Sequence, residues 1–331
     1  MTHLSRRHVL SAAAAAPALA AGAPLLAGAL ASPASAQTGS GQQVPGYYRY
    51  KIGGIEVTAV NDGQRSGPLA DTYVRNASRD QVNAALEAGF LPKDTITNQF
   101  NPLLIRTGDK LVLIDTGNGP QTGNATVGKL TANLGWADVK PGDITTVVIS
   151  HFHGDHINGL RAEDGSLAFP NAEILVPAAE WAYWMDDGQM SRAPEAAQGN
   201  FKNVRRVFKD LESKVTQYGW DKEIAPGLTT VEAVGHTPGH TAFVLAEGNN
   251  KLFIQSDTTN IPVLFAANPD WHVQFDMDPA KAVEVRKRIY DMVAAEKMPI
   301  VGYHHPFPAV SHVRKKGEGY ELVPMSFNPV L

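Results

Sequence analysis

Ser150-His151-Phe152-His153-Gly154-Asp155-His156 follows an apolar run, 144–149, that is typical of a buried strand. Three imidazoles and one carboxylate occupy six consecutive positions, 151–156, and Gly154 lets the backbone turn. His151 and His153 are two residues apart, so an extended segment points both to one side. Asp155 and His156 aim at a second nearby point, a layout expected of two metal ions sharing one loop. The alternative is a surface loop with chance histidines, but the chain holds only 11 His in 331 residues.

Length and composition restrict the class of protein. The chain of 331 residues is long enough for one large core or two modest domains. Its formal net charge is −4 and no basic stripe is visible, so we do not expect nucleic acid as a partner. The absence of cysteine excludes disulfides, cysteine nucleophiles and thiolate ligands. Any metal must therefore be held by nitrogen and oxygen.

Residues 1–36 have the pattern of a targeting segment. Arg6-Arg7 precedes an Ala/Leu-rich run, and Ala34-Ser35-Ala36 offers small residues for cleavage. The segment resembles a bacterial twin-arginine export signal, which predicts a periplasmic or secreted protein. A membrane anchor is the alternative, but Pro and Gly interruptions and weakly apolar alanines make a permanent span unfavourable. No later run reaches ~18 apolar residues, so we expect no stable membrane span after processing.

One domain is expected beyond a short linker. Residues 37–46 are rich in Gln, Gly, Ser, Thr and Pro and predict the linker, and the domain follows over 47–331. Strands alternate with helices through it, without an internal repeat or domain break. The clearest strands are predicted over 101–106, 110–114, 144–149, 173–176, 228–233, 241–246 and 251–255, and the clearest helices over 79–89, 126–134, 200–213 and 279–295.

Further His and Asp side chains fall where predicted strands end. His236 comes just past a strand, and His240 closes the same loop. Asp257 ends another strand, and His304-His305 follows the apolar run 299–302. Singly, each is more often a cap or turn residue. Four strand ends that supply only His and Asp together favour a metal site, because rigid strands hold ligands more firmly than free loops.

These motifs resemble the metallo-β-lactamase fold superfamily. The resemblance rests on Ser-His-x-His-x-Asp-His at 150–156, Gly-His-Thr-Pro-Gly-His at 235–240, Asp257 and a late His, and it covers nearly the whole domain. It implies an α/β fold in a four-layer αββα sandwich with metals at one edge. It also implies a ligand set: His151, His153 and His236 for the first metal, Asp155, His156 and His304 for the second, and Asp257 as a bridge.

Two further residues are interpreted as supports that orient ligands from behind. Asp115 closes the strand 110–114, and His240 follows the ligand of its own loop. The last ligand is expected to be His304, because adjacent side chains of an extended segment point to opposite faces and the family pattern places this His three residues before Phe307. His305 is then expected at the pocket rim or in solvent. A turn at Pro306 that rotates His305 inward is the alternative.

Within the superfamily the chain is most similar to the branch that includes methyl parathion hydrolase and quorum-quenching lactonases. Zinc β-lactamases often use a cysteine ligand and lack the bridging Asp. Homoserine lactonases carry a Tyr shortly after that Asp, where this chain has Thr258-Thr259-Asn260. The resemblance implies a dinuclear hydrolase in which Asp155, Asp257 and a metal-bridging hydroxide cleave an ester, lactone or phosphotriester. The alternatives are a periplasmic protein that binds metal or ligand without hydrolysis, and a β-lactamase.

The expected cofactor is two divalent transition-metal ions per chain. Zinc is placed first, and Fe, Co and Mn also suit imidazoles with carboxylates. The expected partner is a small-molecule substrate, and a homodimer is left open. Aromatic side chains near the metal edge are predicted to form an apolar pocket wall, with a place in the core as an equal alternative: Phe152, Trp181, Trp184, Phe265 and Trp271.

Overall fold

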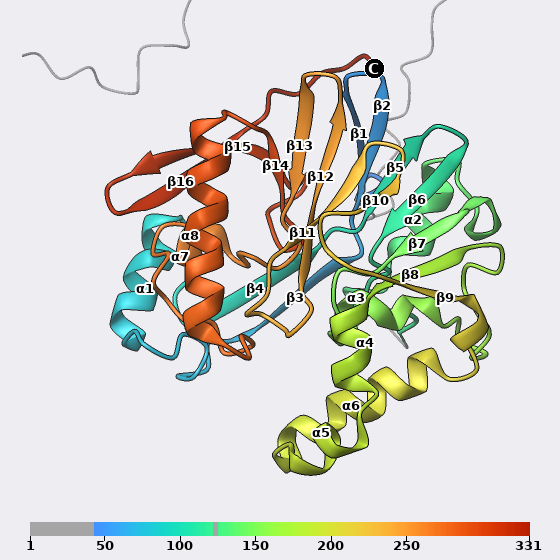
Figure 1. Ribbon diagram of the computed structural model, residues 1–331. Helices are drawn as coiled ribbons and strands as arrows, with labels where there is room; N and C mark the ends of the chain where they lie inside the picture. The colour runs from blue at the N-terminus through green and yellow to red at the C-terminus, as the bar shows by residue number, and fades with distance from the viewer. Residues whose placement is uncertain (1–42, 122–124) are drawn as a thin grey trace, which may run out of the picture. The chain divides into compact units, whose positions relative to one another are not determined.

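Two mixed seven-stranded sheets face each other at the centre of the structure (Figure 1). The computed structural model describes residues 43–121 and 125–331. The predicted export signal and residues 37–42 of the predicted linker lie outside these ranges, and residues 43–46 form neither helix nor strand. Residues Gln43–Leu331 form one compact unit.

The first sheet carries the strand that leads into the histidine-rich stretch. In spatial order its strands are β1 (Tyr47–Ile52), β2 (Ile55–Val60), β5 (Leu103–Thr107), β6 (Lys110–Ile114), β7 (Thr146–Val148), β8 (Glu173–Pro177) and β9 (Val215–Tyr218). Neighbouring strands pair antiparallel from β1 to β6 and parallel from β6 to β9.

The second sheet is antiparallel except where β13 and β14 run parallel. In spatial order its strands are β10 (Glu223–Ala225), β11 (Leu228–Glu232), β12 (Thr241–Glu247), β13 (Asn250–Ile254), β14 (Ile300–Val301), β15 (Val310–Lys316) and β16 (Gly319–Pro324). Three of the four strand-end ligand positions predicted from the sequence, those after β11, β13 and β14, belong to this sheet.

Alternating side chains explain why the sheets are covered on both faces. On β12, Phe243 and Leu245 enter the core between the sheets, while Ala242 and Val244 face the core under the long helix α8 (Pro279–Ala295). Successive strand residues point to opposite faces, so each apolar run supplies two cores. The sequence shows this as nearly continuous apolar strands rather than polar–apolar alternation.

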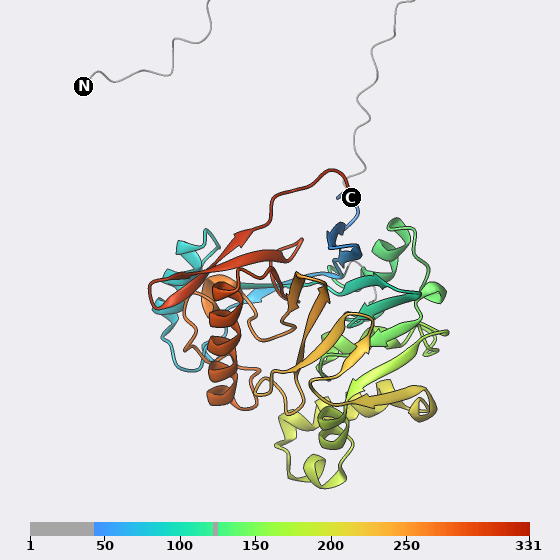
Figure 2. The same ribbon diagram turned by 45° about the horizontal axis from the view of Figure 1, so that its top comes forward.

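Helices form the outer layers. Figures 1 and 2 show α8 across the outer face of the second sheet, where its apolar side packs on Phe253 and Ile300. The first sheet is covered by α2 (Leu130–Trp136), α4 (Ala178–Trp184) and α6 (Glu195–Phe208), which share a core with β6 to β8. The remaining helices among the described residues are α1 (Arg79–Ala88), α3 (Gly154–Ile157), α5 (Asp187–Arg192) and α7 (Pro262–Phe265), beside three short 3-10 turns. The expected αββα sandwich is confirmed.

A small two-stranded sheet lies beside the sandwich, and only the helix between its strands was predicted from the sequence. β3 (Gly63–Pro68) pairs antiparallel with β4 (Thr95–Phe100), and α1 is inserted between them. The sequence of β4, Thr-Ile-Thr-Asn-Gln-Phe, has too few apolar residues to stand out. Another difference concerns α2, which begins at Leu130 rather than at Thr126.

No helix among the described residues is both long and apolar enough to cross a membrane.

The core between the sheets should dominate stability. Phe243→Ala removes a fully buried ring, so we expect the free energy of unfolding to fall by about 3–5 kcal/mol. Phe90→Ala is the matched control, because that ring is 97% exposed, and its effect should stay within about 0.5 kcal/mol. Urea unfolding measures both. Equal losses in the two variants would contradict this placement of the core.

Candidate metal centre

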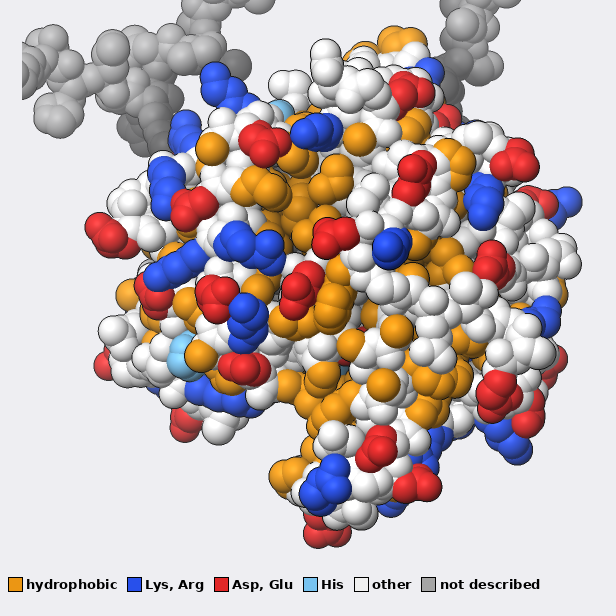
Figure 3. Space-filling model, viewed as in Figure 1, with side chains coloured by type: hydrophobic (Ala, Val, Ile, Leu, Met, Phe, Trp, Pro, Cys, Tyr) orange, Lys and Arg blue, Asp and Glu red, His pale blue; other side chains and the backbone are white. Residues whose placement is uncertain are grey.

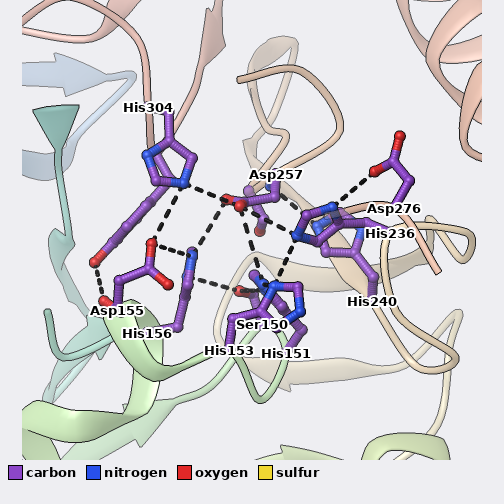
Figure 4. A network of polar contacts seen from close by, with 12 residues as sticks. Ser150, His151, His153, Asp155, His156, His236, His240, Asp257, Asp276 and His304 are labelled. Atoms are coloured by element: carbon purple, nitrogen blue, oxygen red, sulfur yellow. Dashed lines mark hydrogen bonds and ion pairs between the residues drawn. The ribbon is translucent and has the colours of Figure 1, made fainter. Parts of the chain in front are cut away.

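The predicted ligands meet because strand ends from both sheets reach one edge (Figure 4). His151 and His153 follow β7, and the single turn of α3 carries Asp155 and His156. The second sheet brings the other three: His236 follows β11, Asp257 follows β13 and His304 follows β14. All seven side chains predicted as ligands thus lie in one cluster.

The first group consists of three imidazoles. His153 Nδ1 lies 3.1 Å from His151 Nε2 and 2.9 Å from His236 Nε2. Around a tetrahedral ion with metal–nitrogen bonds of ~2.0–2.1 Å, neighbouring ligand atoms are ~3.4 Å apart. The three nitrogens are therefore spaced nearly as ligands of one ion would be.

The second group combines two imidazoles with a carboxylate. Asp155 Oδ2 lies 3.5 Å from both His156 Nε2 and His304 Nε2. Asp257 lies between the two groups: its Oδ2 is 3.0 Å from His304 Nε2 and 3.4 Å from His236 Nε2, and its Oδ1 is 3.3 Å from His156 Nε2. One carboxylate therefore contacts ligands of both groups, which is the position required of a bridge.

The chemistry of the donors fits cations. His156 Nε2 and Asp257 Oδ1 are buried and have no hydrogen-bond partner, although buried polar atoms are normally paired. Both residues belong to one group of possible ligands, and a divalent ion there would satisfy both atoms. Nitrogen and carboxylate oxygen suit zinc and related transition metals.

The pKa values show how strongly the carboxylates attract positive charge. Burial holds the pKa of His153 down at about 3, and burial and the neighbouring imidazoles lower that of His151. Burial acts in the same direction on His236, but hydrogen bonds to Asp257 and Asp276 outweigh it and raise its pKa to about 9. Without metal, a proton on His236 supplies positive charge beside the carboxylates. With metal bound, the ion would supply that charge and the imidazole would be neutral.

Asp115 holds the histidine-rich stretch from behind, as its interpretation from sequence requires. Its Oδ2 accepts from His156 Nδ1 and from the Ser150 hydroxyl, each at 2.8 Å, and its Oδ1 accepts from Ser150 N–H at 2.8 Å. Asp115 has a φ of 61°, a left-handed backbone conformation rare outside glycine that often marks functional sites. The Nδ1–H of His156 is thereby fixed, which leaves Nε2 for the cluster.

His240 lies outside both ligand groups and supports Asp257. Its Nδ1–H donates to the carbonyl of Ala233 at 2.7 Å, so its Nε2 accepts from the Asp257 backbone N–H at 3.0 Å. Burial lowers its pKa to about 4, in keeping with this neutral tautomer. In the same way, His304 Nδ1 donates to the carbonyl of Gln99 at 2.8 Å, so that its Nε2 faces the cluster.

Three buried charged residues at the site were missed from the sequence. Asp276 Oδ1 accepts from His236 Nδ1 at 2.9 Å, and Arg286 lies on the far side of Asp276. Glu180 accepts from Phe152 N–H at 2.9 Å and Gly239 N–H at 2.6 Å, so it joins the loops that carry His153 and His236. None of the three stands in a motif, and only their burial reveals them.

His305 corrects one prediction. It is only 1% exposed, so it lies neither at a rim nor in solvent. Its Nε2 lies 2.5 Å from Gln255 Nε2, in the interior behind the cluster. The two adjacent imidazoles do point in different directions, as predicted. The ring of His305, however, packs inward, where it contacts Gln255 and Gly302.

The predicted aromatic wall is largely wrong. Phe152, Trp184 and Phe265 are at most 2% exposed and belong to hydrophobic cores, where their large apolar area is removed from water. Trp181 and Trp271 are half-buried and pack on these cores. The exposed apolar side chains that neighbour metal-site residues are different ones: Phe275 (43%), Met277 (42%) and Phe307 (36%).

Comparison with known proteins finds lactonases among the relatives of this chain. An N-acyl homoserine lactonase from a Bacillus species is 26% identical over 223 residues, which cover 61% of this chain and 79% of that enzyme. An enzyme of the same name from Bacillus cereus is 27% identical over 168 residues, covering 50% of this chain and 57% of that enzyme. The latter match therefore spans little more than half of the relative.

Two solved structures share the fold over most of the chain. AidC, a dizinc quorum-quenching lactonase in complex with a product, matches with a TM-score of 0.80 at 28% identity, covering 86% of this chain and 98% of AidC. The hydrolase AbOPH, in the beta lactamase superfamily, matches with a TM-score of 0.80 at 26% identity, covering 87% of this chain and 100% of AbOPH.

Fold, site and neighbours define a metal-dependent hydrolase. The His and Asp cluster, taken with the dizinc neighbour, supports a dinuclear centre of divalent metal. A family model described as the metallo-beta-lactamase superfamily matches residues 98–304, which is more than half of the chain. The chain belongs to the metallo-β-lactamase superfamily.

Adjacent histidines provide a sharp test of the ligand set. His304→Ala should lose most of one metal ion, because its Nε2 faces both carboxylates of the cluster. His305→Ala, whose ring is also buried but faces Gln255, should retain both ions. Elemental analysis of the two purified variants measures this. Full occupancy in the His304 variant would reject it as a ligand.

Proposed function

We propose that this protein hydrolyses lactones, with N-acyl homoserine lactones as the first substrate class to test. The observation that carries the proposal is the single carboxylate of Asp257 placed between two groups of ligands, in a fold shared with lactonases. A protein that only binds metal or ligand has no need of seven converging donors. We further propose that zinc is the metal, as it is in the dizinc neighbour.

The net charge of the site favours an electron-rich carbonyl. Two divalent ions bring +4 and the carboxylates of Asp155 and Asp257 bring −2, which leaves +2 inside a buried cluster. When bound, such ions polarise a carbonyl oxygen and lower the pKa of water. Water adds to the lactone carbonyl carbon, the ring carbon–oxygen bond breaks, and the departing oxygen gains a proton, so that one hydroxy acid forms.

The two carboxylates have different freedom to act. The side chain of Asp257 is 3% exposed and its backbone N–H is held by His240, whereas the side chain of Asp155 is 26% exposed. Asp155 is therefore the carboxylate that can orient the attacking water and accept its proton. The Tyr303 hydroxyl donates to the Asp155 carbonyl at 2.5 Å and fixes that residue, so this phenol is not free to contact substrate.

Exposed apolar side chains beside the site suit the apolar part of a substrate. Phe275 and Met277 flank Asp276, and Phe307 comes three residues after His304. Phe275 also packs edge-on against Tyr73, at 6.1 Å between ring centroids. Figure 3 shows further hydrophobic side chains gathered over α4, where Trp181 and Tyr183 are half-buried. We name Phe275, Met277 and Phe307 the apolar rim.

The activity test uses purified protein loaded with zinc. We expect ring opening of N-acyl homoserine lactones, measured by titration of the acid released, in protein that carries about two ions per chain. Asp257→Ala should lower the rate by more than about 100-fold, beyond the loss typical of residues that only support ligands. Faster turnover of methyl parathion, a p-nitrophenyl ester or a penicillin would contradict the lactone proposal. Bound metal without any turnover would favour a binding protein.

The apolar rim should set the preference for acyl chain length. Phe275→Ala and Phe307→Ala should each lower kcat/KM for decanoyl over butanoyl homoserine lactone by about 3- to 10-fold, which corresponds to burying the exposed part of one ring. Trp136→Ala, which removes a 65% exposed ring at the end of α2, should leave this ratio unchanged. A ratio that is unchanged in the rim variants would show that the acyl chain binds elsewhere.

A further inference from the structure

Arg286 on α8 is a buried cation that the proposed chemistry does not use. The residue is 1% exposed, although arginine is rarely buried without partners. Its guanidinium donates to three backbone carbonyls: Nε to Thr258 at 3.1 Å, and Nη1 to both Pro269 and Trp271 at 2.8 Å. Nη2 lies 3.5 Å from Asp276 Oδ2. Each of these contacts falls between residues 258 and 276.

The two ends of this segment lead directly to metal-site residues. Thr258 follows Asp257, the carboxylate between the two ligand groups. Asp276 binds His236 through its other oxygen, and Figure 4 shows it on the side of His236 away from the cluster. The guanidinium of Arg286 thus contacts the residue next to Asp257, and it also contacts Asp276, the side chain that binds His236. His236 Nε2 and Asp257 Oδ2 lie 3.4 Å apart across the site.

The start of α8 also contacts the His236 loop. Met277 N–H donates to the carbonyl of His236 at 3.1 Å, and Asp278 N–H donates to that of Gly235 at 2.8 Å. A Cβ added at Gly235 would lie 2.4 Å from the backbone nitrogen of Ala282, so the loop lies directly against the helix. α8 therefore forms the base on which this side of the metal site rests.

An arginine suits this position because three of its nitrogens face four separate acceptors. The planar fork of a guanidinium donates in several fixed directions, whereas a lysine ammonium is a compact point charge. Removing the fork leaves three carbonyls and the carboxylate of Asp276 with unpaired acceptors in the interior, which costs free energy at each of them. The segment 258–276 would then shift. Because its ends are joined to Asp257 and His236, both of these residues would shift as well.

We propose that Arg286 is a positioning residue that sets the distance between His236 and Asp257 and thereby the affinity for both metal ions. The proposal rests on the dinuclear site of the proposed function but not on the identity of the substrate. The proposal assigns different effects to Arg286 and Asp276, because Asp276 contacts the ligands only through His236. Loss of Arg286 should weaken both ions, because Asp257 serves both, while loss of the Asp276 charge should weaken only the ion of the three-imidazole group.

The experiment measures metal affinity rather than turnover. Metal-free wild type, Arg286→Met, Arg286→Lys and Asp276→Asn are titrated with Co²⁺, followed by its visible absorption, and with Zn²⁺ against a chromophoric chelator. We expect Arg286→Met to raise the dissociation constants of both ions by about 10–100-fold. Arg286→Lys should lie between wild type and Arg286→Met. Asp276→Asn should raise the constant of one ion alone.

A matched control separates positioning from general loosening of α8. Tyr320→Phe removes the hydroxyl that lies 2.8 Å from Asp291 Oδ1 and 3.4 Å from the Lys287 carbonyl on the same helix. Neither group is a partner of Arg286 or of a metal-site residue, so both metal affinities should stay unchanged. Circular dichroism shows whether each variant is folded. If Arg286→Met is unfolded, the metal affinities of Arg286→Lys decide the test. Wild-type affinity in both Arg286 variants, or weakening of only one ion, would overturn the proposal while leaving a two-ion wild type and its proposed function intact.

Discussion

The constraint on which the rest of the structure depends is the crowding of lone pairs at one edge of the sandwich. His153 Nδ1 lies 3.1 Å from His151 Nε2 and 2.9 Å from His236 Nε2, and the buried carboxylate of Asp257 lies 3.4 Å from His236 Nε2. Such groups repel one another unless positive charge lies between them, and burial makes an unpaired polar atom costly. The fold must therefore hold the donors together against this repulsion until cations bind. Two sheets whose strand ends meet at one edge provide the rigid frame.

The frame works because three of the ligands are each fixed from behind by a different element. Asp115 after β6 orients His156, the carbonyl of Gln99 on β4 orients His304, and Asp276 before α8 orients His236. A hydrogen bond at one ring nitrogen fixes the tautomer and leaves the other nitrogen free for metal. These supports come from the first sheet, the small β3–β4 sheet and the segment before α8. The outer parts of the fold are thus part of the site.

The sequence predicts those parts of the site that are local. His151 to His156 lie within one turn of chain, so their types and spacing are visible without the fold, and strand-end positions expose His236, Asp257 and His304. The partners of these ligands are distant in sequence: 40 residues separate His236 from Asp276, and 205 separate His304 from Gln99. A backbone carbonyl has no sequence signal at all.

The same distinction explains the failed aromatic wall. Phe152 lies between two ligands in sequence, but along an extended segment it points away from them, and it stacks on Phe208 with ring centroids 4.6 Å apart. Trp184 is drawn inward by Glu180, which accepts from its indole N–H at 2.8 Å. Closeness in sequence to a ligand therefore indicates little about a large apolar side chain until its exposure is known. Its burial is decided by partners that only the fold brings near.

Differences in exposure give the cluster a direction. The rings of His151 and His156 are fully buried and Asp257 nearly so, while His153 is half-buried and Asp155 keeps about a quarter of its side chain exposed. The cluster is thus closed on the side of the strand ends and open at the start of α3. In the lactone hydrolysis that we propose, a substrate carbonyl would approach beside Asp155. The two carboxylates would then take different parts, because Asp257 is held by its backbone and its contacts, whereas Asp155 would exchange a proton with water. The fold, rather than the chemistry of the side chain, makes this distinction.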